Sequence, residues 1–118
     1  PRYLEDALDK HAKVTSWDKI DSKDHYIYRV KRDKGLSDII VHLSDEYEYT
    51  LDDYFQKSEE ILEESFILIA KPEAKYDDSI VEVATQDKIS IGKFGALMGA
   101  IYVKEHWCYV PKERREEN

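Results

Sequence analysis

Ionisable side chains follow three apolar segments of strand length, and these residues are the best placed to do chemistry. Segment 39–43 is followed by acids, segment 66–70 by lysines around a glutamate, and segment 89–91 by a glycine and a lysine. In an open α/β sheet, ligands bind outside the carboxyl ends of the strands. If the three strands are parallel, acids of the first loop meet lysines of the other two. The residues are His42, Ser44, Asp45, Glu46 and Glu48, then Lys71, Glu73 and Lys75, then Gly92 and Lys93.

The Glu-Ala-Lys tripeptide at residues 73–75, preceded in the chain by Asp38 and Asp45, resembles the acidic and Glu-x-Lys pattern of the restriction-endonuclease-like nucleases. The resemblance implies that Asp38 or Asp45 holds Mg²⁺ together with Glu73, while Lys75 stabilises charge at the phosphate. The leading helix and the later helix–strand–helix order also resemble that fold. Two departures weigh against it: a proline ends the strand before Glu73, and a helix separates two motif strands that usually form a hairpin in the family.

Glycines at the start of a helical segment form a second candidate site. The sequence Ile-Gly-Lys-Phe-Gly at residues 91–95 resembles the Ile-Gly-x-x-Gly loop of KH domains, which implies an RNA contact through Gly92 to Gly95. A second interpretation is anion binding by Gly92, Lys93 and Gly95, because glycines at a strand-to-helix turn can aim N–H groups at a phosphate. We prefer a structural interpretation, in which Gly95 and Gly99 let the helix pack closely on the sheet.

The segment that follows residue 44 joins negative charge to rigid aromatic surface. It consists of Asp45, Glu46, Tyr47, Glu48 and Tyr49. We expect an exposed loop in which the acids steer a basic partner and the tyrosines anchor it. The alternative is that the segment continues the preceding strand, with its tyrosines facing the sheet and its acids facing water.

The periodicity of the apolar residues predicts an α/β (or α+β) fold with a small mixed sheet of four to five strands. The first half of the chain is expected to contain a helix over 2–14, a polar connection over 18–24, a strand hairpin over 26–30 and 39–43, and a helix over 50–64. The second half is expected to contain a strand over 66–70, a helix from 77 or 78, a strand over 89–91, a helix over 94–101 and an optional strand over 107–109. Residues 1–111 form one domain and 112–118 a charged tail. The predicted core is Ile39, Val41, Leu43, Phe66, Leu68, Ile89 and Leu97.

Charge and cysteine content narrow the function classes. The chain of 118 residues has 18 basic and 26 acidic side chains, a net charge of −8, which opposes general binding to nucleic acid or anionic membrane. No apolar run reaches the ~18 residues of a membrane span. The lone Cys108 excludes an internal disulfide and fits a reducing, cytoplasmic setting. His106 and Cys108 are too few for a zinc site, so we expect no metal.

We therefore predict a non-enzymatic intracellular binding or regulatory module that engages a protein partner, one with a basic face, through the acidic, tyrosine-rich surface. The first alternative is the Mg²⁺-dependent nuclease of residues 38, 45, 73 and 75. The second is the KH-like RNA contact. We expect no cofactor, apart from Mg²⁺ under the nuclease alternative, and the oligomeric state is not predicted.

Overall fold

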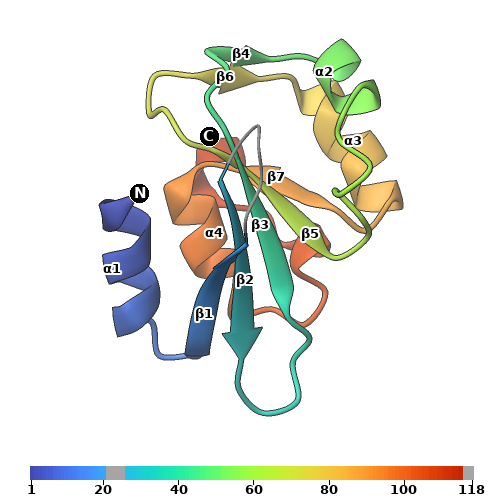
Figure 1. Ribbon diagram of the computed structural model, residues 1–118. Coiled ribbons are helices and arrows are strands. Elements are labelled where there is room, and N and C mark those ends of the chain that lie inside the picture. The colour runs from blue at the N-terminus through green and yellow to red at the C-terminus, as the bar shows by residue number, and fades with distance from the viewer. Residues whose placement is uncertain (21–25, 116–118) are drawn as a thin grey trace.

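Helices pack on both faces of a five-stranded mixed sheet, and a two-stranded ribbon lies beyond one end of it (Figure 1). The computed structural model describes residues 1–20 and 26–115. The elements are α1 (Arg2–Lys10), β1 (Val14–Ile20), β2 (Ile27–Arg32), β3 (Ile39–Ser44), β4 (Glu48–Tyr49), α2 (Leu51–Phe55), β5 (Ser65–Ile69), β6 (Lys75–Tyr76), α3 (Asp78–Gln86), β7 (Ser90–Gly92), α4 (Phe94–Ala100) and the 3₁₀ turns η1 (His106–Cys108) and η2 (Lys112–Arg114). The predicted mixed α/β architecture is confirmed.

Strand direction changes in the middle of the sheet. The strand order is β1-β2-β3-β5-β7, with antiparallel pairing from β1 to β3 and parallel pairing from β3 to β7. The parallel register aligns Val41 with Phe66 and Ile67 with Ile91. The carboxyl ends of β3, β5 and β7 therefore meet at one end of the sheet, where the sequence predicted that the polar loops would meet.

Two apolar clusters lie on opposite faces of the sheet, because successive strand side chains alternate between faces. Phe66 and Leu68 point into the first cluster with residues of α1 and α4. Ile67 and Ile69 point into the second cluster with residues of α2 and α3. All seven predicted core residues are buried, and the most exposed of them, Leu43, keeps only 6% of its surface. The central strands of the sheet are thus buried on both faces, as their continuous apolar sequence predicted.

The predicted N-terminal helix is too long, because a strand follows it that the sequence analysis missed. The helix α1 ends at Lys10, and His11 takes an extended conformation with φ −71° and ψ 130°. Val14–Ile20 then forms β1, where we expected the end of the helix and a polar connection. As an edge strand, β1 has one polar face in water, and its Val14 and Trp17 pack against the first cluster. The indole N–H of Trp17 donates to Asp9 at 2.7 Å. The rest of the expected connection, residues 21–25, lies outside the described part of the chain.

Two further elements differ from the expectation. The helix predicted over 50–64 is limited to Leu51–Phe55, although the predicted capping pair Thr50 and Asp53 is present in full. After it the chain runs irregularly to β5, with Ile61 half-buried in the second cluster. The optional strand at 107–109 is the 3₁₀ turn η1, closed by hydrogen bonds from Cys108 N to Glu105 O and from Tyr109 N to His106 O.

Arg32, the last residue of β2, joins the sheet to the segment that follows α4. Its side chain is 6% exposed, and its guanidinium donates to the carbonyl oxygens of Ile101 at 3.1 Å and Val103 at 2.8 Å, after α4. Its Nε donates to Ser37 O at 2.8 Å. A planar guanidinium suits such a site because it presents several donors in fixed directions. Loss of solvation on burial lowers the pKa of Arg32 from its ordinary value, and the charges of Glu64 and Asp38 partly offset this effect.

The two glycines of α4 that were predicted to allow close packing differ in role. A Cβ on Gly99 would overlap the ring of Tyr109, so this position requires glycine. A Cβ on Gly95 would meet nothing within 4 Å. The prediction of close packing on the sheet is therefore wrong for both positions: Gly95 has open space beside it, and Gly99 admits the ring of Tyr109, which follows η1, and not a strand.

Candidate functional site

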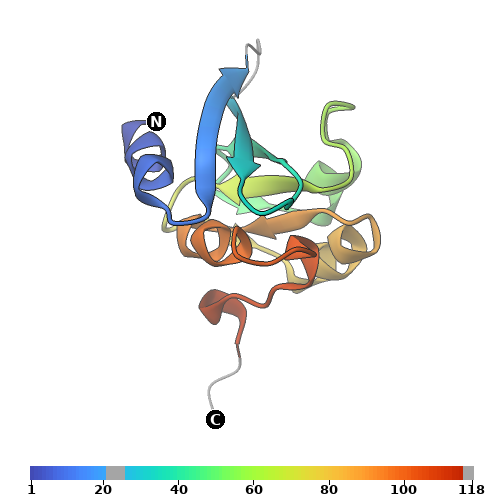
Figure 2. The same cartoon turned by 90° about the horizontal axis from the view of Figure 1, so that it is seen from below.

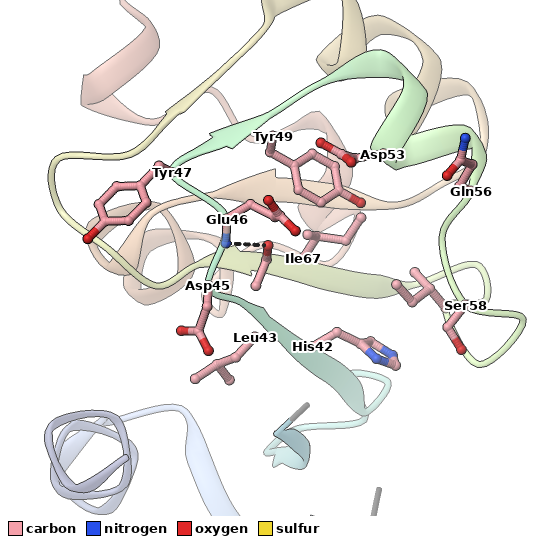
Figure 3. A pocket seen from close by; sticks show the side chains of 12 residues that line it. His42, Leu43, Asp45, Glu46, Tyr47, Tyr49, Asp53, Gln56, Ser58 and Ile67 are labelled. Atoms are coloured by element: carbon pink, nitrogen blue, oxygen red, sulfur yellow. Dashed lines mark hydrogen bonds between the residues drawn. The ribbon is translucent and has the colours of Figure 1, made fainter. Parts of the chain in front are cut away.

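A pocket of about 500 Å³ opens at the carboxyl end of β3, facing the segment that follows α2 (Figure 3). Its volume falls in the range of ordinary ligand pockets, about 300–1,000 Å³. Segments far apart in the sequence contribute to it, because the parallel pairing of β3 and β5 brings α2 and its following loop alongside. The lining residues are His42, Leu43, Ser44, Asp45, Glu46, Tyr47, Tyr49, Asp53, Gln56, Ser58, Ile61 and Ile67.

The charge of the pocket is negative. Asp45, Glu46 and Asp53 contribute carboxylates, and the described residues that line it include no lysine or arginine. Carboxylates gathered around one hollow attract cations and repel anions. The pocket therefore favours a positively charged group over a neutral or negative one.

Local hydrogen bonds hold the backbone of Glu46 and the carboxylate of Asp53 in place. The hydroxyl oxygen of Ser44 accepts a hydrogen bond from Glu46 N at 3.3 Å, where the chain leaves β3. Asp53 Oδ2 accepts from Thr50 N at 2.9 Å, and Thr50 Oγ1 accepts in turn from Asp53 N at 3.2 Å. This reciprocal pair is a capping box, and it fixes the first turn of α2 at the edge of the pocket.

The predicted contact segment is exposed at four of its five positions. Asp45, Glu46, Tyr47 and Glu48 are exposed, and Tyr47 retains 63% of its surface. Tyr49 is only 6% exposed, so its assignment as an exposed contact residue is wrong. The strand alternative is partly correct: β4 is a strand, but it pairs with β6 in the small ribbon and turns Tyr49 into the second cluster.

Tyr49 forms a neutral wall of the pocket. Burial, with a smaller contribution from the charges of Asp53 and Glu46, raises the pKa of Tyr49 to about 12. The phenol therefore keeps its proton at every physiological pH. Tyr49 adds a hydrogen-bonding hydroxyl to the pocket without adding charge.

The exposed ring of Tyr47 already holds a cation of the same chain. The ammonium nitrogen of Lys71 lies 3.9 Å from the centroid of the ring. Lys71 comes from the loop after β5, so the parallel sheet brings together the acid-rich and the lysine-bearing loop, as the sequence predicted. A cation over an aromatic face is attracted by about 0.5–1 kcal/mol at an exposed site.

Of the four residues of the nuclease pattern, Asp38 lies apart from the other three. Asp38 precedes β3 and Asp45 follows it, so a strand length of roughly 20 Å separates them. Since β5 runs parallel to β3, Glu73 and Lys75 follow at the end where Asp45 lies, and Asp38 lies at the other end. Across residues 1–20 and 26–115, no three histidine, cysteine, aspartate or glutamate side chains are placed to hold one metal ion.

A glutamate of the chain occupies the position predicted for a bound anion at Gly92, Lys93 and Gly95. Lys93 N donates to both carboxylate oxygens of Glu113 at 3.3 Å. Glu113 belongs to η2, which lies beside α4 and away from β1 (Figure 2). The predicted solvated tail is therefore wrong at its start, because residues 112–114 form η2, whose Glu113 and Arg114 are bonded to the domain. Residues 116–118 of that prediction lie outside the described part of the chain.

Sequence reasoning missed a buried serine–histidine pair. Ser90 Oγ lies 2.5 Å from His106 Nδ1, and His106 Nε2 lies 3.0 Å from the carbonyl oxygen of Glu64. Nε2–H therefore donates to the carbonyl, and Nδ1 accepts from the Ser90 hydroxyl. Burial lowers the pKa of His106 to about 4. His106 is 1% exposed and Ser90 is 7% exposed, so the pair is sealed from any substrate and holds η1 to β7.

No family model, no curated protein and no solved structure matches this chain. None of the described helices combines the length and the apolar character that crossing a membrane requires.

Proposed function

We propose that this protein is a non-enzymatic binding module that recognises a basic segment of a protein partner at the pocket beside β3. The observation that carries the proposal is the lining of that pocket, which has three carboxylates and no lysine or arginine among the described residues. An arginine or lysine side chain of the partner would enter the pocket between Glu46 and Asp53. Its neighbours along the partner chain would lie over the exposed segment 45–48.

Different residues of this surface contribute to different steps of recognition. The carboxylates of Asp45, Glu46 and Glu48 attract a basic partner from a distance and raise the rate of encounter. Tyr47 supplies a rigid exposed ring that a second cation or an aliphatic stem can cover. The ring already binds a cation within this chain, because the ammonium group of Lys71 lies over it.

An organic cation fits this pocket better than a metal ion does. A divalent metal needs several ligand oxygens that converge on one point at about 2.0–2.6 Å. The described carboxylates of the pocket are spread along its wall and do not form such a group. A guanidinium or ammonium group on a long stem can use dispersed acids and also cover apolar walls. As part of the proposal we place the protein in a reducing cytoplasm, because its one cysteine, Cys108, is exposed and free.

Fluorescence anisotropy with two defined peptides tests the proposal. The probes are a labelled octapeptide of alternating arginine and glycine and its counterpart with glutamate in place of arginine. We expect the arginine peptide to bind and the glutamate peptide not to bind. Tyr47→Ala should weaken binding by about 1 kcal/mol or more, a factor of about five, whereas Glu48→Gln should mainly flatten the dependence on salt.

A matched control separates recognition from general exposure of aromatic surface. Tyr102 is 55% exposed and follows α4, where it packs against His11, away from the pocket. Tyr102→Ala should leave the affinity unchanged. Equal affinity for the two peptides, or an equal effect of Tyr47→Ala and Tyr102→Ala, would contradict the proposed function.

Lys71 should compete with the partner for the ring of Tyr47. Lys71→Gln is therefore expected to tighten binding of the arginine peptide about two- to fivefold, the value of one exposed cation–π contact. Lys57→Gln is the control for loss of one positive charge, since Lys57 lies over Tyr54 instead, at 4.0 Å from that ring. If the two substitutions tighten binding equally, the competition at Tyr47 does not exist.

A further inference from the structure

The binding segment is attached to a very small ribbon. The strands β4 and β6 have two residues each, and their register pairs Glu48 with Lys75 and Tyr49 with Tyr76. One further backbone hydrogen bond runs from Lys75 N to Tyr47 O at 2.9 Å. Even a longer isolated two-stranded ribbon is marginally stable in water. Tyr49 anchors one end of β4 in the second cluster, but Tyr47 and Glu48 are exposed, so their position also depends on what holds β6.

The side chain of Tyr76 ties β6 to the C-terminal turn. Its hydroxyl donates to the carboxylate of Glu113 and accepts from Arg114 Nη1 at 3.0 Å. The ring of Tyr76 packs against the second cluster and lies 5.9 Å from the guanidinium carbon of Arg114. Two charged residues of η2 thus converge on one hydroxyl of the ribbon.

The same two residues bind the main sheet on their other side. Arg114 Nη1 donates to the carbonyl oxygen of Ile91, in β7, at 2.7 Å, and Nη2 donates to Tyr109 O at 3.2 Å. Glu113 accepts from Lys93 N, directly after β7. The turn η2 therefore bridges the last strand of the sheet and the ribbon. A parallel tie joins Lys93 Nζ to the carbonyl oxygen of Pro72 at 2.7 Å, in the loop that leads to β6.

We propose that Tyr76, Glu113 and Arg114 are positioning residues for the binding segment: they dock the ribbon on the sheet and so hold Tyr47 and Glu48 in the conformation that receives a basic partner. This inference rests on the proposed function. The C-terminal turn acts at a distance from the pocket, through the register of β6 with β4. A partner binds only the docked ribbon, so its apparent affinity scales with the docked fraction.

Tyr76→Phe tests the inference because it removes both hydrogen bonds of the hydroxyl and keeps the ring. The two bonds together contribute about 2 kcal/mol, so the equilibrium between the docked and open forms should shift by about thirtyfold. Hydrogen exchange of the Lys75 amide, which is protected only in the docked ribbon, should accelerate by up to about the same factor. The arginine peptide should bind at least about threefold more weakly, since the docked form of such a small ribbon is only slightly more stable than the open form. Glu113→Gln should act in the same direction with a smaller effect.

Tyr28→Phe is the matched control. The hydroxyl of Tyr28 donates to Glu5 Oε2 at 2.5 Å on the opposite face of the sheet, so its loss also breaks a tyrosine–carboxylate bond. It should change neither exchange at Lys75 nor peptide affinity. If Tyr76→Phe binds the peptide as tightly as the wild type does, or if Tyr28→Phe weakens binding equally, the inference is overturned. If the wild-type protein does not bind the arginine peptide, the proposed function is overturned instead.

Discussion

The buried histidine of the serine–histidine pair should make the protein lose stability in mild acid. Burial lowers the pKa of His106 from 6.5 to about 4 in the folded state, so the unfolded chain takes up a proton first as the pH falls. The stabilisation is fully present above pH 6.5 and is lost as the pH falls from there to about 4. The gap between the two pKa values corresponds to about 3 kcal/mol in all, and to about 2 kcal/mol at pH 5.

Urea unfolding at a series of pH values measures this loss. The matched variant is His106→Asn, whose side-chain carbonyl can still accept from Ser90 but which cannot titrate. Between pH 8 and pH 5, the free energy of unfolding of the wild type should fall by about 2 kcal/mol more than that of the variant. Equal pH dependence of the two proteins would refute the assignment of a neutral, buried imidazole. The comparison cancels the other titrating groups, which both proteins share.

Three further predictions concern the glycines, the core and catalysis. Gly99→Ala should destabilise the protein by about 1–3 kcal/mol in thermal unfolding, because the new methyl group overlaps a tyrosine ring, whereas Gly95→Ala should be neutral or stabilising by up to about 1 kcal/mol. Leu68→Ala should cost about 2–5 kcal/mol in urea unfolding, and a loss below about 1 kcal/mol would place that residue outside the core. With Mg²⁺ or Mn²⁺, the pure protein should not cleave DNA or RNA. Cleavage that disappears in Glu73→Ala and Lys75→Ala would establish the nuclease instead.

The buried strands could be predicted from the sequence because their apolar runs are continuous and of strand length. Segments 39–43 and 66–70 are apolar at every position except His42, and the structure buries both faces of β5 and most of β3. β1 could not be predicted in the same way, because an edge strand with one face in water shows too few apolar residues to set a period. The alternation of Tyr47 with Tyr49 indicated a strand, but not that its partner would be β6.

The candidate site was only partly visible in the sequence. The acids after β3 were found because they follow a strand end, where ligands bind in such sheets. The contribution of Asp53 depends on the crossover that returns α2 to the same end, which no local pattern specifies. The pairing of Ser90 with His106 spans 16 residues, and the bonds of Arg32 to residues 101 and 103 span about 70. Such contacts arise from tertiary packing and leave no periodic signal.

The missed edge strand also determines how this molecule meets other chains. A free strand edge offers unpaired backbone groups to any other strand, and it is a common starting point for aggregation. β1 has a register shift between Val14 and Ser16, and exposed charges at Asp18 and Lys19. Both features discourage the addition of another strand. At the opposite edge η1 packs beside β7. One edge of the sheet therefore carries charges and the other is covered by η1. Other chains are then bound more readily through side chains than by addition of a strand to the sheet.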